Sequence, residues 1–275
     1  MSEDPMVVRL TASRTEVHRV GAVVVRAAGP WSRSVHALLR HLEEEGFPGS
    51  PRVIGDGFDP AGNEVLSYIE GEFARPHAWT DEGIAALGRL LRRFHDATAG
   101  FLPPADAAWQ PWFTRSGSAD AIFGHGDLGP WNIVARDGLP VGFIDWEFAG
   151  PVDRLDEVAQ VVWLNAQLHD DDIAARNHLP SAEARARQVG LFADAYGLGA
   201  EERSGLVTRM IEQAVRDAAN EITEPDGLKI AKLPAGPEDH GWAVSWRVRS
   251  AAWLVAHRPL LDTALVPGEG SEAST

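Results

Sequence analysis

The sequence predicts an α+β protein built of two unequal parts. Short β-branched and aliphatic runs dominate the beginning of the chain, whereas apolar residues at helical spacing dominate the remainder. A polar break at Glu70-Gly71-Glu72 separates the two patterns. We therefore expect a small, strand-rich part at residues 1–70 and a mainly helical part at residues 71–275.

The strands of the first part are predicted by four short runs rich in β-branched and aliphatic residues. These runs are Val7–Thr11, Val20–Arg26, Arg52–Gly55 and Val65–Ile69. Residues 34–46 predict a helix, because apolar side chains recur there at helical spacing and Gly46 can end it. The first part is thus expected to combine strands with one helix.

The helices of the second part follow from the same spacing of apolar residues. The first begins after Thr80, whose hydroxyl can cap it. Later helices are expected at about 153–169, 182–196, 200–221 and 239–256. The last carries Trp242, Trp246 and Trp253 on one face, and such a stripe favours burial in the core over a wall that stacks on a ligand.

Residues 131–145 predict a β-hairpin within the helical part. Asp137-Gly138 is a favoured two-residue hairpin turn, and aliphatic runs flank it on both sides. If this turn sets the register, Asn132 and Asp145 lie together at the open end of the hairpin.

The loop before the hairpin carries His125-Gly-Asp127, followed after four residues by Asn132. A chance match to this pattern is expected in about one chain in a thousand, given average residue usage. The oxygens of Asp127, Asn132 and Asp145 then converge at the hairpin mouth. Hard oxygen ligands without His or Cys suit Mg²⁺, which carboxylates hold together with substrate phosphates. The alternative is a polar loop with Asx turns beside a capped hairpin.

The composition excludes several classes of protein. The 275 residues carry a formal net charge of −15, which repels a phosphate backbone, so nucleic acid is not expected as a partner. No apolar run approaches the ~20 residues of a membrane-spanning helix, and residues 1–9 are too acidic and polar for a secretory signal. The lack of cysteine excludes disulfides and thiolate metal sites and agrees with a cytoplasmic location.

Two motifs resemble those of the aminoglycoside phosphotransferase and choline kinase family: His125-Gly-Asp127-x-x-x-x-Asn132 and Ile144-Asp145-Trp-Glu147. The order of elements is compatible with the family from about residue 7 to about residue 256. The resemblance implies a two-lobed, protein-kinase-like fold. The first part would be a nucleotide-binding lobe with an antiparallel sheet, and the second would hold the catalytic loop and the acceptor site. The implied activity is ATP- and Mg²⁺-dependent phosphorylation of a small-molecule hydroxyl.

The resemblance also assigns roles within the motifs. Asp127 would be the catalytic base that orients the acceptor hydroxyl and takes its proton, and Asn132 and Asp145 would bind Mg²⁺. His125 would be a scaffold residue of the catalytic loop that hydrogen-bonds to backbone. Glu147 would reach either a metal-bound water or solvent.

Two further expectations come from the family. The hinge between the lobes gives backbone hydrogen bonds to adenine in the family, and here it corresponds to Ser67-Tyr68-Ile69. Asp156 matches an aspartate that opens the next helix, where it would cap that helix and brace the catalytic loop.

The strand-rich part departs from the family pattern. The family places a strand lysine on the nucleotide phosphates, but here Arg26 stands in that place and no lysine precedes Lys229. Arginine keeps the charge and can bind phosphate through two N–H groups, so we expect Arg26 to contact the phosphates. The alternative is a surface arginine at a strand end. The phosphate loop has no glycine, so Ser13 and backbone N–H groups are expected to cover the phosphates.

The residue that pairs with Arg26 is not determined by the sequence. In the family a glutamate on the following helix pairs with the lysine, but this helix offers Val35 or His36 at that place. The candidates that remain are His36, Glu43 and Glu44.

The acceptor is expected to be a small, cationic molecule bound by the helical part, which is rich in carboxylates. The candidate groups, each of which could also be a solvated face, are Asp170-Asp171-Asp172, Glu201-Glu202, Glu221, Glu224 and Asp226. One alternative is a kinase for an amino alcohol, a sugar or another metabolite. A second is a catalytically inactive, nucleotide-binding regulator, which Arg26 and the glycine-free loop would suit. The complete set of Asp127, Asn132 and Asp145 argues against an inactive protein.

Overall fold

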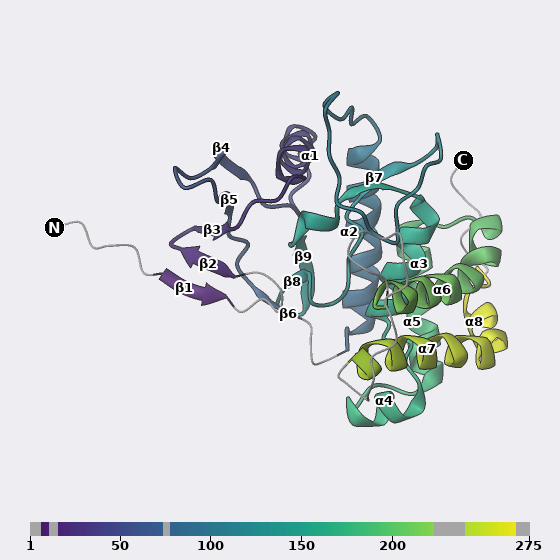
Figure 1. Ribbon diagram of the computed structural model, residues 1–275. Coiled ribbons are helices and arrows are strands. Elements are labelled where there is room, and N and C mark those ends of the chain that lie inside the picture. Colours follow the sequence, from purple (N-terminus) through teal and green to yellow (C-terminus); the bar gives the residue numbers. More distant parts are fainter. Residues whose placement is uncertain (1–6, 11–15, 74–77, 223–239, 268–275) are drawn as a thin grey trace.

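The computed structural model describes residues 7–10, 16–73, 78–222 and 240–267. A strand-rich part and a larger helical part lie side by side, as Figure 1 shows. The predicted α+β class, with an antiparallel sheet in the N-terminal part and helices in the C-terminal part, is confirmed. Within the described ranges, no helix combines the length and the apolar character needed to cross a membrane.

The N-terminal part is a five-stranded antiparallel sheet in the order β1-β2-β3-β5-β4. Its strands are β1 (Val7–Leu10), β2 (Val17–Val20), β3 (Val23–Arg26), β4 (Val53–Phe58) and β5 (Glu64–Ser67). Helix α1 (Ser32–Glu44) joins β3 to β4. It buries Val35, Leu38, Leu39 and Leu42, the side chains whose spacing predicts the helix.

One predicted strand, Val20–Arg26, is two strands in the structure. Gly21 turns the chain between β2 and β3 with a φ of +61°, a conformation that glycine adopts without a steric penalty. The predicted strand Val65–Ile69 is also shifted, because β5 begins at Glu64 and ends at Ser67.

Seven helices are described in the C-terminal part or at its end. They are α2 (Asp81–Thr98), α3 (Arg154–Asn165), α4 (Asp171–Arg176), α5 (Ala182–Tyr196), α6 (Ala200–Asn220), α7 (His240–Ala256) and α8 (Arg258–Ala264). The predicted cap of α2 is confirmed, since Thr80 Oγ1 accepts a hydrogen bond from the Gly83 N–H. The short helices α4 and α8 have no counterpart among the predicted elements.

Short strands carry the loops of the site. The hairpin strands β8 (Ile133–Arg136) and β9 (Leu139–Phe143) form a three-stranded sheet with β6 (Glu72–Phe73). Strands β7 (Ile122–Gly124) and β10 (Gly150–Val152) pair with each other on either side of the predicted catalytic loop and hairpin.

One hydrophobic cluster joins the two parts. It runs without interruption from Leu38 and Leu42 on α1 to Phe94 on α2 and Phe143 on β9, all of them fully buried. The rings of Phe94 and Phe143 meet edge to face, with their centroids 5.9 Å apart. This shared core fixes the position of the hairpin relative to α1 and the N-terminal sheet.

Candidate functional site

The hairpin turn sets the geometry at the mouth of the site. Asp137 and Gly138 both have positive φ, 51° and 74°, as a tight two-residue hairpin turn requires. At the other end of the hairpin, the Ile144 N–H donates to the Asn132 carbonyl over 2.9 Å. Asn132 and Asp145 therefore lie close together at the open end, as the sequence predicts.

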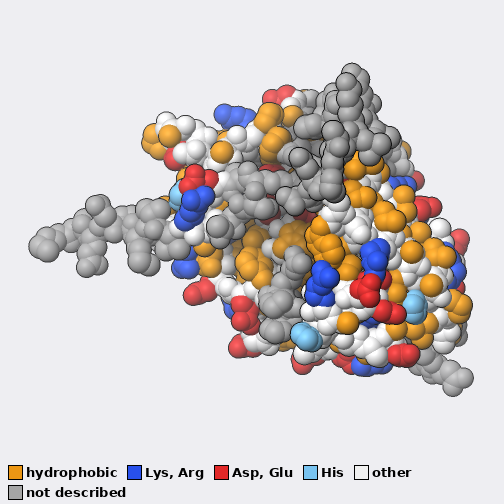
Figure 2. Space-filling model, turned by 60° about the horizontal axis from the view of Figure 1, so that its bottom comes forward, with side chains coloured by type: hydrophobic (Ala, Val, Ile, Leu, Met, Phe, Trp, Pro, Cys, Tyr) orange, Lys and Arg blue, Asp and Glu red, His pale blue; other side chains and the backbone are white. Residues whose placement is uncertain are grey.

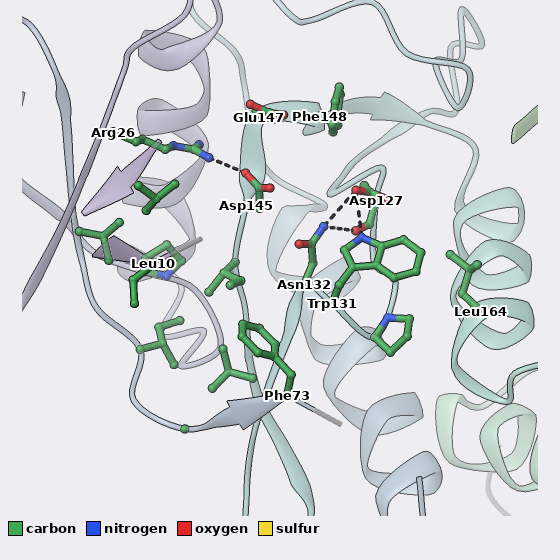
Figure 3. A pocket seen from close by; sticks show the side chains of 18 of the residues that line it. Leu10, Arg26, Phe73, Asp127, Trp131, Asn132, Asp145, Glu147, Phe148 and Leu164 are labelled. Atoms are coloured by element: carbon green, nitrogen blue, oxygen red, sulfur yellow. Dashed lines mark hydrogen bonds and ion pairs between the residues drawn. The ribbon is translucent and has the colours of Figure 1, made fainter. Parts of the chain in front are cut away.

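Asp127 projects from the preceding loop onto the same hairpin mouth. The Asn132 side-chain amide donates to the Asp127 backbone carbonyl at 2.8 Å and to its carboxylate at 3.0 Å, which ties the loop to β8 (Figure 3). Burial raises the pKa of Asp127 to about 8; the charges of Asp217 and Asp145 add to this, and the hydrogen bonds from Trp131 and Asn132 oppose it. A carboxyl group with a pKa this close to neutral pH can exchange a proton with a bound molecule.

Two buried groups hold the predicted catalytic loop in place through hydrogen bonds. A His125 ring nitrogen, Nε2, lies 2.8 Å from the Ile144 carbonyl, the backbone hydrogen bond expected of a scaffold residue. The Glu157 carboxylate accepts from the Gly126 N–H at 2.7 Å and from His95 at 2.8 Å. Glu157 is completely buried in α3, directly beneath the loop.

The expectation that Asp156 caps the helix and braces the loop is wrong in both respects. The Asp156 carboxylate pairs with Arg209 and Arg216, which both lie on α6. Asp153 caps α3, since it accepts from the N–H groups at the start of that helix. The neighbouring Glu157 braces the loop, because successive helical residues lie about 100° apart and only that position faces the loop.

Arg26 reaches the hairpin mouth from the N-terminal part. Its Nη1 lies 2.5 Å from Asp145 Oδ1, an ion pair that Figure 3 shows bridging the two parts. Asp145 takes a left-handed backbone conformation, with φ 63°, at the start of the short helix Trp146–Phe148. Such a conformation is uncommon outside glycine and recurs at functional sites.

Glu64 is the main partner of Arg26, and the sequence reasoning missed it. Arg26 Nε pairs with Glu64 Oε2, and the other oxygen of this carboxylate lies 2.9 Å from His36 Nε2. Glu64 and His36 are each about 1% exposed. Burial alone would lower the pKa of Arg26 and raise that of Glu64. The attraction between these two charges, together with the contacts to Asp145 and His36, outweighs burial, so the pKa of Arg26 is raised and that of Glu64 is lowered.

Of the three candidates for pairing with Arg26, only His36 belongs to the network, and it acts through Glu64. Glu43 instead lies 3.6 Å from Arg52, and Glu44 is exposed. The available signal for Glu64 was its place at the start of an apolar run. The pairing of β3 with β5, which sets Arg26 opposite Glu64, is decided only by the sheet topology.

The residues predicted to form the hinge, Ser67, Tyr68 and Ile69, line the same cavity as Arg26. The Ser67 and Tyr68 N–H groups donate to the carbonyls of Arg52 and Ala22. No hydrogen bond between described residues uses the Ile69 N–H, so this group is the best placed of the three to meet a ligand. Ser13, expected to cover the phosphates, lies outside the described residues.

A cavity of about 970 Å³ lies between the N-terminal and helical parts. Besides the hinge, it brings together Arg26, Asp127, Asn132 and Asp145, all from the predicted set. Glu147 also lines it and acts electrostatically on Arg26. The volume is at the upper end of the range for pockets that enclose small molecules, which leaves room for two ligands side by side.

The helical end of this cavity departs from the sequence expectation. The carboxylates that line it are Glu221 and Asp217, of which only Glu221 was among the predicted groups. Asp217 follows Met210 and Ala214 on the buried stripe of α6, and a carboxylate on such a stripe was the signal available. The stripe of α7 is not uniformly core: Trp253 is buried, whereas Trp242 and Trp246 line the cavity.

The other predicted carboxylate groups lie elsewhere. Asp170 and Asp172 pair with Arg249 on the surface, and Glu202 pairs with Arg154. Glu201 is exposed at the start of α6. Glu224 and Asp226 fall outside the described residues.

The oxygen donors at the hairpin mouth fit Mg²⁺ only if other ligands complete its coordination. Within the described ranges, no group of three or more His, Cys, Asp and Glu side chains could hold a metal ion alone. Asn132 and Asp145 offer oxygens to the cavity, one amide and one carboxylate (Figure 3). Because Mg²⁺ is usually bound by one or two carboxylates plus phosphate oxygens, this pair suits an ion that arrives with a nucleotide.

Comparison with known proteins gives two close matches in sequence. The model of a family described as "Phosphotransferase enzyme family" matches residues 14–121 and 103–204. The chain is also 51% identical over 254 residues to the trifolitoxin immunity protein of Rhizobium leguminosarum bv. trifolii. That match covers 92% of this chain and 95% of the relative.

Solved structures of kinases share the fold. An amicoumacin kinase in complex with AMP-PNP and Ca²⁺ superposes with a TM-score of 0.62 at 13% identity, over 92% of this chain and 89% of that chain. A microcompartment-associated aminopropanol kinase gives 0.61 at 14% identity, over 97% and 95%. A choline/ethanolamine kinase family protein from Mesorhizobium loti gives 0.59 at 15% identity, over 94% and 92%. At identities this low, the likeness to these structures shows a shared fold and nothing more.

Proposed function

Because this chain belongs to the phosphotransferase enzyme family, we propose that it transfers the terminal phosphoryl group of ATP to a hydroxyl group of a small, cationic toxin or antibiotic. The observation that carries the proposal is the convergence of Arg26, Asp127, Asn132 and Asp145 on one cavity. These residues come from both parts of the chain, so the cavity has a cationic group on one wall and the Asp127 carboxylate on the other.

Asp127 is the proposed catalytic base. The acceptor hydroxyl must face the phosphoryl group and lose its proton as it attacks, and a fixed carboxylate performs both tasks. The amide of Asn132 holds one Asp127 oxygen, and the Trp131 indole N–H lies 3.4 Å from the same atom. The carboxylate is therefore oriented before an acceptor arrives.

Arg26 is the proposed phosphate-binding residue. Its guanidinium is oriented by buried Glu64 and faces the cavity beside Asp145. A planar guanidinium can donate two hydrogen bonds to phosphate oxygens, which stabilises the charge of the transferred group. Residues 1–70 would then form the nucleotide-binding lobe, with the hinge at Ser67-Tyr68-Ile69 against the adenine, and residues 71–275 the acceptor lobe.

Asn132 and Asp145 are the proposed Mg²⁺ ligands. When bound, Mg²⁺ neutralises charge on the nucleotide phosphates and fixes their orientation. The Arg26–Asp145 ion pair means that one carboxylate oxygen is already engaged by a cation of the protein itself. Asp145 can therefore couple the position of Arg26 to the binding of the metal-nucleotide complex.

The toxin as acceptor is supported by the relative named an immunity protein, with which this chain shares half of its residues over nearly its whole length. Phosphorylation adds up to two negative charges to a hydroxyl and changes its hydrogen bonding, which would prevent a toxin from fitting its target. Since ATP is the proposed donor and the chain lacks cysteine, we place the reaction in the cytoplasm.

The proposal is tested by measuring ADP release from ATP with purified protein, Mg²⁺ and a panel of acceptors: trifolitoxin, aminoglycosides, amino alcohols and sugars. We expect release that depends on one class of acceptor, with one phosphoryl group added to that acceptor by mass spectrometry. Calorimetry with Mg²⁺ and ATP should show binding to the wild type, and no Mg²⁺-dependent binding to Asp145→Ala.

The panel also distinguishes the alternatives. Turnover of an amino alcohol or a sugar, without turnover of a toxin, would indicate a metabolite kinase. No acceptor-dependent turnover, together with no binding of Mg²⁺ and nucleotide, would overturn the proposal and favour a non-catalytic regulator.

A further inference from the structure

The backbone directly before Asp127 is held on both sides of one glycine. Gly126 has a φ of +82°, and because glycine can adopt many backbone conformations, contacts with other segments must fix the one it takes. The Gly126 N–H donates to the buried carboxylate of Glu157 over 2.7 Å. The Gly126 carbonyl belongs to the peptide unit that leads into Asp127, and it accepts from the indole N–H of Trp112 over 2.9 Å. Glu157 and Trp112 together therefore fix the backbone from which the proposed base projects.

The ring of Trp112 also reaches the segment that carries Asp145. The Trp112 and Phe148 rings are stacked, with centroids 3.7 Å apart and an angle of 21° between their planes. Phe148 follows Asp145 by three positions and lines the same cavity, where Figure 3 shows it above Asp127. The two segments touch here, since a Cβ added to Gly126 would lie 2.4 Å from the Phe148 carbonyl oxygen. One side chain thus contacts the Asp127 loop through its N–H and the Asp145 segment through its ring.

Arg115 holds Trp112 in this position. Its Nη2 donates to the carbonyls of Phe148 and Ala149 at 2.8 and 3.0 Å, and its backbone N–H donates to the Trp112 carbonyl at 3.1 Å. Both residues belong to the connection between α2 and β7, residues 99–121, which has no helix or strand of its own. Connections of this length without regular structure are uncommon in compact domains and usually serve a function. Hydrogen bonds to the Asp145 segment, and not a helix or strand, therefore fix the place of Trp112.

Exposure distinguishes Trp112 from the aromatic residues at the rim of the cavity. Phe73 and Trp242 also line the cavity, but they are 50% and 53% exposed. Figure 2, which turns the underside of the molecule forward, shows hydrophobic side chains gathered in the middle of that face. Trp112 is only half-buried as a residue, yet its N–H and one face of its ring are engaged within the protein. Its contacts thus belong to the frame of the site.

We infer that Trp112 is a positioning residue for phosphoryl transfer, because its indole N–H orients the backbone of Asp127 and its ring holds the Asp145 segment in place beside it. This inference rests on the proposed function, since it assigns a role in that same reaction. Phosphoryl transfer is accelerated mainly by holding the reacting groups in a fixed geometry. The two contacts of Trp112 then have separable effects: the N–H acts on the proposed base, and the ring acts on the proposed metal ligand.

Hydrogen exchange followed by mass spectrometry tests these contacts without any substrate. Trp112→Phe keeps an aromatic ring beside Phe148 and removes the N–H donor. We expect about fivefold faster exchange of amides in residues 124–132, because the backbone before Asp127 loses a hydrogen bond, and unchanged exchange in residues 145–150. Trp112→Ala removes both contacts and should speed exchange in both segments.

Kinetics test the role in the reaction. Calorimetry with Mg²⁺ and ATP counts the binding-competent sites, and ADP release is measured per such site, with the member of the acceptor panel that the wild type turns over fastest. Trp112→Phe should lower this kcat about tenfold and leave the KM for ATP unchanged, because only the proposed base is displaced. Trp112→Ala should also weaken binding of Mg²⁺ and ATP about fivefold, since the Asp145 segment loses its stacked ring. A purely structural loss would lower the number of sites and not the rate per site.

Trp109→Phe is the matched control. Trp109 lies three residues earlier in the same connection, packs against Phe123 with ring centroids 5.4 Å apart, and is not among the described residues that line the cavity. The control makes the same chemical change away from the site. It should alter neither the exchange of residues 124–132 nor kcat per site.

The inference is overturned if Trp112→Phe exchanges the amides of residues 124–132 at the wild-type rate, or if its kcat per site equals that of Trp109→Phe. It is also overturned if the KM for ATP rises as much as kcat falls, because the N–H would then act on the whole cavity. Failure of the proposed function is a separate result. It would show in the wild type as a lack of Mg²⁺-nucleotide binding and of acceptor-dependent ADP release, whatever the exchange rates of the variants.

Discussion

Arg26 and Glu64 stand directly opposite each other on β3 and β5, although 38 residues separate them in the chain. The carboxylate of Glu64 lies between the guanidinium of Arg26 and the imidazole of His36 on α1. The helix therefore contributes an imidazole where the resembling kinases have a carboxylate, and the carboxylate comes from the neighbouring strand. Gly57 permits this packing, because a Cβ there would lie 2.4 Å from His36 Nδ1.

Glu64→Gln should weaken both the fold and the site. The substitution removes the carboxylate bound to Arg26 Nε and leaves Asp145 and the more weakly acting Glu147 to balance the buried guanidinium; removing one member of a buried ion pair typically costs about 3–5 kcal/mol. We expect a lower free energy of unfolding in urea and a higher KM for ATP. Glu43→Gln is the control, since that carboxylate lies on the exposed end of α1 and should change neither. An unchanged KM for ATP in folded Glu64→Gln would show that Glu64 has no part in positioning Arg26.

Arg26→Ala should raise the KM for ATP or lower kcat, because a charge-assisted hydrogen bond to phosphate is lost. Arg26→Lys should recover only part of the activity, since an ammonium is a shorter point donor that cannot contact Glu64 and a phosphate in the same planar way. Steady-state kinetics with varied ATP measure both effects. If Arg26→Ala equals the wild type in both constants, the phosphates are held without this residue.

Asp127→Asn keeps the shape of the side chain and removes the proton acceptor. We expect kcat to fall by about 10²–10⁴-fold while calorimetry shows unchanged binding of Mg²⁺ and ATP. The hydrogen bond from the Asn132 amide can still form to the remaining oxygen, so the loop should keep its position. Turnover near that of the wild type would remove Asp127 from the role of base.

Glu157→Gln should destabilise the protein most at neutral pH. The pKa of Glu157 is lowered despite complete burial, because His95 and the Gly126 N–H stabilise its charged form. A group with a lowered pKa in the folded state contributes stability above its unfolded pKa of about 4.3, and this contribution disappears as the pH falls through the folded value. The gap in unfolding free energy between wild type and variant, about 2–4 kcal/mol near pH 7, should therefore shrink in acid.

Chemical denaturation at a series of pH values measures this gap. Asp156→Asn provides the comparison, because that carboxylate pairs with Arg209 and Arg216 on α6. It should leave kcat unchanged, whereas Glu157→Gln should lower it. Equal kcat values for the two variants would contradict the assignment of Glu157 as the brace of the loop.

Features encoded over short stretches of chain were predictable from the sequence. The turn at Asp137-Gly138 needs two residues that tolerate positive φ, and it sets the pairing of β8 with β9 beside the turn; a one-residue register shift between Val134 and Ala135 leaves the two strands paired as far as Ile133 and Phe143. The hairpin therefore brings Asn132 and Asp145 together independently of how the rest of the chain packs. The apolar face of α1 and the cap of α2 at Thr80 are similarly local, since they depend on neighbours three or four positions away.

Features that depend on which elements pack together could not be predicted from the sequence. The sequence by itself determined the α+β class, the hairpin and the meeting of Asn132 with Asp145, because backbone preference and hydrophobic periodicity act within one element. Only the tertiary structure decided that Glu64 lies opposite Arg26, that Glu157 and not Asp156 faces the catalytic loop, and that Trp246 and Arg247 line the cavity. Each of these depends on the pairing of distant strands or the rotation of a packed helix about its axis, which a small difference in packing energy among many long-range contacts selects.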